Sequence, residues 1–203
     1  MIGNLTLSDV ILVIIVLLVS MSIHEAMHAY AGHALGDTTA QEEGRLSLNP
    51  LRHIDPFMTV LLPAATLLLF GFPVLAAKPV PFNPYRVRYG EYGAALIALA
   101  GPLSNFVLAF LSAWALHYTV AGTLLDRGLQ WGVELNVVLF VFNLIPIPPL
   151  DGSRVLYAFA PESLQRIMAQ IEPFGIFVVF ALVLVTNGQF LVGLYNLVFQ
   201  LLP

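Results

Sequence analysis

Long apolar stretches separated by short polar segments dominate the chain, and they predict membrane-crossing helices. An α-helix rises about 1.5 Å per residue, so about 20 apolar residues cross the ~30 Å hydrocarbon core of a bilayer. The stretches interpreted in this way are residues 9–35, 92–120, 129–144 and 173–202. The last is interrupted at Asn187-Gly188, so its pattern fits either one tilted span or two half-spans. The pattern predicts an all-α polytopic membrane protein.

Residues 57–77 are also apolar, but they are broken at Pro63 and at Gly71-Phe72-Pro73. Proline removes a backbone donor and clashes with the preceding helical turn, so a regular spanning helix is disfavoured there. This segment could cross fully, re-enter the membrane or form a hairpin. We therefore expect about four to six membrane segments, with a re-entrant or in-plane insert and short extended segments near the active site.

Composition supports the membrane interpretation and excludes several classes of function. Hydrophobic residue types make up 59% of the 203 residues and charged types only 10%, against about 45–50% and about 25% in soluble domains. The net charge is −4 and no basic cluster appears, so no nucleic-acid partner is expected. Cysteine is absent, which excludes disulfides, thiolate metal sites and cysteine nucleophiles. The length fits one integral-membrane domain over residues 1–203.

An H-E-x-x-H motif, His24-Glu25-Ala26-Met27-His28, lies in the first apolar stretch. Histidines at i and i+4 project from one helix face and can bind one metal ion, with the glutamate beside them as general acid/base. The motif could arise by chance on a wet helix face. Here, however, three ionisable residues lie in an apolar span, where a charge costs about 2.5–3.5 kcal/mol on insertion scales, and such residues usually mark function.

A catalytic zinc site needs a third protein ligand, and Asp151 is the best candidate. It follows Pro146, Pro148 and Pro149 at the end of an apolar span, and non-helical backbone at membrane depth is tolerated only where it is buried or lines a cavity. The alternatives are that Asp151 merely caps a helix over residues 153–159, and that Asp55 is the ligand instead.

Three motifs in this order resemble the site-2 protease family of intramembrane zinc metalloproteases. They are the H-E-x-x-H motif, Gly101-Pro102-Leu103-Ser104-Asn105, and the stretch from Asn143 through the prolines to Leu150-Asp151-Gly152. The resemblance spans about residues 23–152, the core motifs, and leaves a C-terminal membrane portion at 173–202. It is to a compact form without a PDZ or nucleotide-sensing domain.

The resemblance implies a function and a role for each motif residue. His24, His28 and Asp151 would bind one Zn²⁺ per chain, although such a set also accepts other divalent ions. Glu25 would be the general acid/base, and Asn143 would hold the substrate carbonyl or its oxyanion. Asn105 would have a supporting role. The implied activity is hydrolysis of peptide bonds within or near transmembrane helices of membrane-protein substrates, as in regulated intramembrane proteolysis.

The metal site constrains the topology, since His28 lies near the end of the first helix and Asp151 follows the span 129–144. Both ends must lie on one side to share an ion, so residues 57–77 cannot make one full crossing. All basic residues except Arg127 then share that side, which the positive-inside rule makes cytoplasmic. We expect a multi-pass protein of the cell membrane with its site in the bilayer toward the cytoplasm. The basic residues on that side are Arg45, Arg52, Lys78, Arg86, Arg88, Arg154 and Arg166.

Two other functions remain open at the level of sequence. A divalent-metal transporter would also place His and Asp in spans, but it would need further acidic residues, and the spans 92–120 and 129–144 offer only Glu134. A catalytically inactive relative could bind membrane helices without cleaving them, although the intact Glu25 argues against this. The expected partners are membrane-spanning protein substrates and the lipid bilayer. A substrate segment could pair with residues 43–48 by β-augmentation. The sequence leaves the oligomeric state open.

Overall fold

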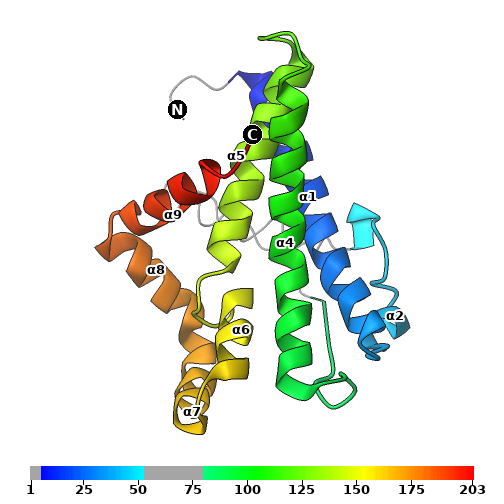
Figure 1. Ribbon diagram of the computed structural model, residues 1–203, viewed down its shortest axis with the longest axis vertical. Coiled ribbons are helices and arrows are strands. Elements are labelled where there is room, and N and C mark those ends of the chain that lie inside the picture. Colours follow the sequence, from blue (N-terminus) through cyan, green and yellow to red (C-terminus); the bar gives the residue numbers. More distant parts are fainter. Residues whose placement is uncertain (1–5, 53–79) are drawn as a thin grey trace.

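The computed structural model describes residues 6–52 and 80–203, and every regular element within these ranges is a helix. Three helices form its centre: α1 (Leu7–Ala34), α4 (Gly90–Leu116) and α5 (Leu124–Asn143) (Figure 1). The predicted all-α membrane class is confirmed, because α1, α4 and the helical stretch Glu162–Val185 are long and apolar enough to cross a membrane. The remaining elements are α2 (Thr39–Glu42), η2 (Pro50–Arg52), α6 (Asp151–Phe159), α7 (Glu162–Ile171), η4 (Glu172–Phe174), α8 (Gly175–Val185) and α9 (Gln189–Phe199).

Polar contacts join the beginnings of α1 and α5 at one end of the bundle, and the two helices run parallel. Thr6 caps α1 by accepting from the Asp9 backbone N–H, and the Asp9 carboxylate accepts from the Thr6 backbone N–H in return. Asp9 Oδ1 also lies 3.1 Å from an Arg127 nitrogen in the first turn of α5. Both helices therefore begin at the same end, and α4 runs between them in the opposite direction (Figure 1).

At the other end, the chain leaves α1 and returns to α4 at the same place. The Arg88 N–H donates to the Leu35 carbonyl at 2.8 Å, and the Asn83 N–H donates to Asp37 Oδ2 at 2.6 Å. Burial raises the pKa of Asp37, but hydrogen bonds from Thr39 and the Asn83 N–H outweigh it and lower the pKa below its ordinary value. The end of α1 and the beginning of α4 therefore lie on one side, which agrees with the topology inferred from the metal ligands. The predicted re-entrant segment, 57–77, lies outside the described residues.

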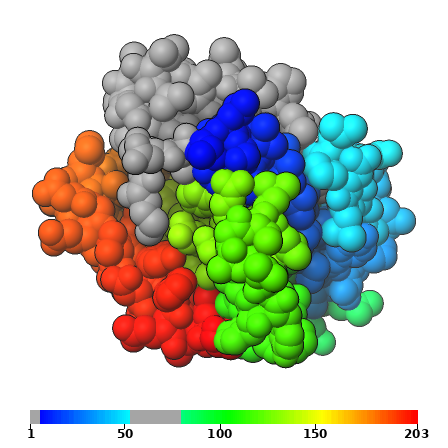
Figure 2. Space-filling model, turned by 90° about the horizontal axis from the view of Figure 1, so that it is seen from above, coloured from blue at the N-terminus to red at the C-terminus, as the bar shows by residue number. Residues whose placement is uncertain are grey.

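Small and β-branched side chains allow α4 and α5 to pack closely. Their buried contact consists of alanines from α4 and valines from α5, and α9 packs against it with partly buried apolar side chains. Viewed from above, α8 and α9 lie on one side of α4, and α1 and α2 lie on the other (Figure 2). The buried contact consists of Ala109, Ala113, Val133, Val137 and Val141.

The C-terminal apolar stretch forms two helices rather than one. Asn187 and Gly188 take left-handed backbone conformations, with φ of 49° and 71°, and the chain turns there between α8 and α9. Each helix has 11 residues, or about 16 Å, about half the thickness of the hydrocarbon core. The structure shows the interruption at Asn187-Gly188, but α8 is also part of the longer helical stretch Glu162–Val185, so the choice between one tilted span and two half-spans stays a prediction. The total number of membrane segments stays a prediction.

Candidate metal centre

Helix α1 brings His24 and His28 onto the face that packs against α4. Their Nε2 atoms lie 3.0 Å apart, one helical turn along α1. The Nδ1 atom of His28 donates to the Ile97 carbonyl at 2.7 Å, and the Nδ1 atom of His24 contacts Asn105 Oδ1 at 2.6 Å. Both acceptors belong to α4, so the packing of the two helices orients both imidazoles.

A turn rich in proline brings Asp151 to the histidines. Helix α5 ends at Asn143, the turn follows, and α6 begins at Asp151 and runs antiparallel to α4 until Phe159, which contacts Tyr92 near the start of α4. Asp151 Oδ2 lies 3.1 Å from the Nε2 atom of His24 and 3.4 Å from that of His28. The N-cap position of α6 is held by Leu150 and not by Asp151, so the structure favours the ligand interpretation over the helix-cap alternative.

The hydrogen positions leave three acceptor atoms facing one another. A main-chain carbonyl can only accept, so the Nδ1 atom of His28 carries the hydrogen, and the Nε2 atom of a neutral imidazole is then a lone pair. The Nδ1 atom of His24 likewise faces an acceptor, Asn105 Oδ1, so its Nε2 is also a lone pair. The carboxylate of Asp151 is the third acceptor. Tetrahedral bonds of about 2.0–2.1 Å to zinc separate ligand atoms by about 3.3 Å, close to the observed 3.0, 3.1 and 3.4 Å. The donor set and its spacing therefore fit zinc.

Gly101 of α4 leaves the space that this cluster occupies. A Cβ atom at this position would lie 2.3 Å from the Nε2 atom of His28 and 2.6 Å from that of His24, far inside van der Waals contact. The sequence identified Gly101 only as the first residue of the motif Gly101-Pro102-Leu103-Ser104-Asn105. Its position directly before Pro102 in the quoted motif was the available signal, but the motif does not show that it faces the histidines.

The other predicted site residues have different surroundings. Glu25 is partly buried, and its Oε2 accepts from the Val80 N–H at 3.0 Å. Asn143 ends α5 and its Nδ2 donates to the Leu139 carbonyl at 2.9 Å, one turn back in its own helix. The structure gives Asn143 no contact with the three clustered side chains, so its role at the substrate stays a prediction. Asp55, the alternative ligand, lies outside the described residues.

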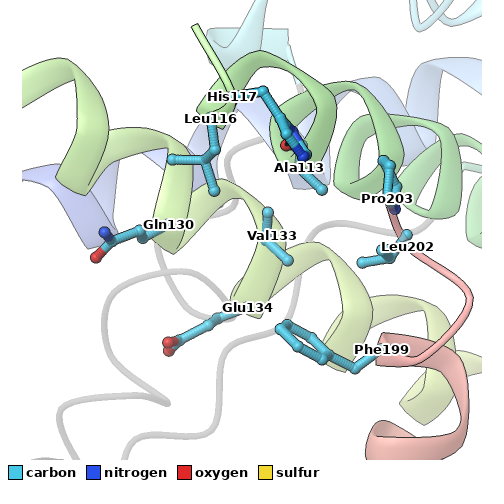
Figure 3. A pocket seen from close by; sticks show the side chains of 9 residues that line it. All are labelled: Ala113, Leu116, His117, Gln130, Val133, Glu134, Phe199, Leu202 and Pro203. Carbon is cyan, nitrogen blue, oxygen red and sulfur yellow. Dashed lines mark hydrogen bonds between the residues drawn. The ribbon is translucent and has the colours of Figure 1, made fainter. Parts of the chain in front are cut away.

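A cavity of about 400 Å³ lies away from this cluster, between α4, α5 and the C-terminal end (Figure 3). Its polar lining consists of His117, Gln130 and Glu134, and the rest of its wall is apolar. It shares no residue with the histidine–aspartate cluster, so it is not the space in which a metal at His24 and His28 would act. Its apolar lining consists of Ala113, Leu116, Val133, Phe199, Leu202 and Pro203.

Comparison with known proteins places this chain among zinc metalloproteases. The model of Peptidase family M50 matches residues 119–186. A Bacillus subtilis protein named "Putative zinc metalloprotease YwhC" is 39% identical over 182 residues, which cover 85% of this chain and 80% of the relative. The chain belongs to peptidase family M50, the site-2 protease family. "Putative zinc metalloprotease Rip2" of Mycolicibacterium smegmatis is 32% identical over 178 residues, covering 86% of this chain and 67% of that protein. No solved structure matches the chain.

Membership of the M50 family agrees with the chemistry of the cluster. The family and its named relatives indicate a membrane metallopeptidase that uses zinc, and the apolar helices make this member a multi-pass membrane protein. His24, His28 and Asp151 form a group that could hold the metal. The resemblance read from the three sequence motifs is therefore confirmed.

Proposed function

We propose that this M50 protein is an intramembrane zinc endopeptidase that cleaves peptide bonds within or near transmembrane helices of membrane-protein substrates. The observation that carries the proposal is the convergence of three acceptor atoms from His24, His28 and Asp151, with Glu25 next to the first histidine. Zinc bound there would supply Lewis acidity toward the substrate carbonyl and toward water.

The chain's own residues then have separate tasks. Glu25 would accept the proton of the attacking water and return it to the leaving amine, which is the general acid/base role. Its carboxylate is held by the Val80 N–H, so it is oriented before substrate arrives. Asn143 would turn its Nδ2 from the Leu139 carbonyl to the substrate carbonyl oxygen and stabilise the charge that develops there.

The depth of the cluster supports cleavage inside the bilayer. His28 precedes the end of α1 at Ala34 by six residues, or about 9 Å along the axis. That end carries the described arginines except Arg127, and the positive-inside rule makes it cytoplasmic. We therefore place the site in the cell membrane, toward the cytoplasmic side. A substrate helix must unwind locally to be cleaved, because its peptide groups are otherwise hydrogen-bonded within the helix.

The proposal is tested with the purified protein in liposomes that contain a single-span helical substrate. Wild type and Glu25→Gln are first shown to hold equal zinc, and cleavage is then followed by mass spectrometry. We expect Glu25→Gln to keep its zinc and lose cleavage. Equal cleavage by both proteins, or none by either, would contradict the assignment.

The same liposomes test the transporter alternative. A zinc-sensitive dye inside the vesicles reports metal entry, and the protease assignment predicts no entry above that of empty vesicles. Entry that depends on His28 and is unaffected by Glu25→Gln would instead favour transport.

A further inference from the structure

Asn136 of α5 is a buried polar residue that lies outside all the motifs quoted above. It is 2% exposed, and Asn105 of α4, which it contacts, is 0% exposed. Asn136 Oδ1 accepts from Asn105 Nδ2 at 2.9 Å, and Asn136 Nδ2 donates to the Gly132 carbonyl at 2.8 Å. Two side-chain amides from neighbouring helices are therefore joined in the helical core, directly behind His24.

The Gly132 carbonyl, at one end of this series of hydrogen bonds, determines the orientation of both amides. The Gly132 main-chain carbonyl can only accept, so Asn136 turns its Nδ2 toward it and its Oδ1 toward Asn105. Asn105 must then present its Nδ2 to Asn136 and its Oδ1 to the Nδ1 atom of His24, 2.6 Å away. The imidazole of His24 therefore carries its hydrogen on Nδ1, and its Nε2 is left as a lone pair.

Asn136 is the main partner that holds Asn105 in this orientation. The other acceptor for Asn105 Nδ2 is the Ser20 carbonyl, at 3.5 Å, which is at the outer limit of a hydrogen bond. Without Asn136, the amide of Asn105 could turn over and present its Nδ2 to His24. The hydrogen of that imidazole would then move to Nε2, the atom that faces His28 and Asp151. His28 has no such dependence, because a main-chain carbonyl receives its Nδ1 hydrogen.

We propose that Asn136 is a positioning residue that acts through Asn105 to keep His24 in the tautomer whose Nε2 can bind the metal. The inference rests on the metal ligands of the proposed function. It also explains why an amide that touches neither metal ligand nor substrate is kept in an apolar helix core, where an unpaired polar group is costly.

Three variants separate orientation from packing. Asn136→Leu keeps the branching at Cγ, with larger methyl groups, and removes both hydrogen bonds, whereas Asn136→Asp keeps an oxygen toward Asn105. Val137→Ala is the packing control, because Val137 is the next residue, is 0% exposed, belongs to the buried α4–α5 contact and has no polar side-chain atom. Zinc affinity is measured by competition with a chelator. We expect it to fall about tenfold in Asn136→Leu and to stay within about threefold of wild type in the other two. Equal losses in Asn136→Leu and Val137→Ala would overturn the proposal.

A second measurement needs neither zinc nor activity. Nitrogen-15 NMR of the histidine-labelled, zinc-free protein in bilayers, at mildly alkaline pH, reports which ring nitrogen carries the hydrogen. His24→Gln identifies the signal of His24. We expect the Nδ1–H form in wild type, Asn136→Asp and Val137→Ala, and a mixture of both forms in Asn136→Leu. An unchanged His24 signal in Asn136→Leu would refute the inference.

These measurements also separate this inference from the proposed function. If Asn136→Leu does not fold, Asn136→Ala takes its place, with the same expected mixture of tautomers. A wild-type protein that binds no zinc, but whose His24 tautomer depends on Asn136, would support the positioning role and contradict the protease assignment. A wild-type protein that binds zinc, but whose His24 tautomer and zinc affinity do not depend on Asn136, would contradict the positioning role and leave the protease assignment supported.

Discussion

Replacing Gly101 with alanine should strongly weaken zinc binding while leaving the helix intact. The added Cβ would lie 2.3 Å from the Nε2 atom of His28, where ordinary contacts begin at about 3.4 Å. The imidazole would have to withdraw by roughly 1 Å. Zinc–ligand distances tolerate only about ±0.2 Å, so the displaced nitrogen could not remain a ligand.

The size of the effect follows from the number of ligands disturbed. The same Cβ would lie 2.6 Å from the Nε2 atom of His24, so two of the three protein ligands are displaced together. Loss of a single supporting contact typically costs 10–100-fold in metal affinity. We expect Gly101→Ala to weaken zinc binding by at least about 100-fold, or about 2.8 kcal/mol at about 1.4 kcal/mol per tenfold.

Helix stability should not explain this loss. Alanine favours helix over glycine by up to about 1 kcal/mol, so the substitution by itself stabilises α4. Gly32→Ala in α1 is the matched control, because its Cβ would meet only the Ile97 Cδ1 atom at an ordinary 3.8 Å.

Both variants are purified, and their zinc content and affinity are measured by chelator competition alongside circular dichroism. Gly32→Ala should match wild type. Wild-type zinc affinity in a folded Gly101→Ala protein would show that the cluster of histidines and Asp151 is not the metal site.

Three further predictions concern single residues. His28→Ala should weaken zinc binding more than about 100-fold in the chelator assay, while His33→Ala, exposed on the same helix, should not change it. Asn143→Ala should retain zinc but lower the rate of substrate cleavage by about 100-fold or more, and an unchanged rate would remove it from the mechanism. The pKa of Asp37 is lower in the folded than in the unfolded protein, so its stabilising effect is complete above the unfolded pKa and is lost as pH falls through the folded one. The melting temperature of wild type, measured by thermal unfolding, should therefore fall more steeply with decreasing pH than that of Asp37→Asn.

Local features of the chain were enough to predict the central helices and two of the three candidate metal ligands. The apolar stretches predicted α1 and α4 because continuous hydrophobicity over about 20 residues has few other solutions in a bilayer. The shorter apolar stretch 129–144 predicted most of α5, which is not among the helices apolar enough to cross a membrane by themselves. His24 and His28 share a helix face through the helical period alone, so their pairing needed no tertiary information.

The third ligand could be inferred only indirectly. Asp151 lies 127 positions from His24 along the chain, and no periodicity relates them. It became a candidate because prolines at a helix end place non-helical backbone at membrane depth, and the need for both helix ends to lie on one side then constrained the expected topology. The Asp9–Arg127 and Leu35–Arg88 contacts show the chain directions that this reasoning needed.

The space and the hydrogen bonds around the ligands were decided by tertiary structure alone. Gly101 belongs to a quoted motif and Asn136 to none, but a glycine or an asparagine in an apolar helix does not indicate in sequence which neighbour it faces. Their roles depend on how α4 and α5 are oriented about their axes relative to α1. That orientation results from many side-chain contacts between residues distant in sequence. The sequence by itself therefore determined the helices and the chemistry of the ligands. Only the packing of the helices decided the room that the ligands have and the nitrogen that His24 leaves free.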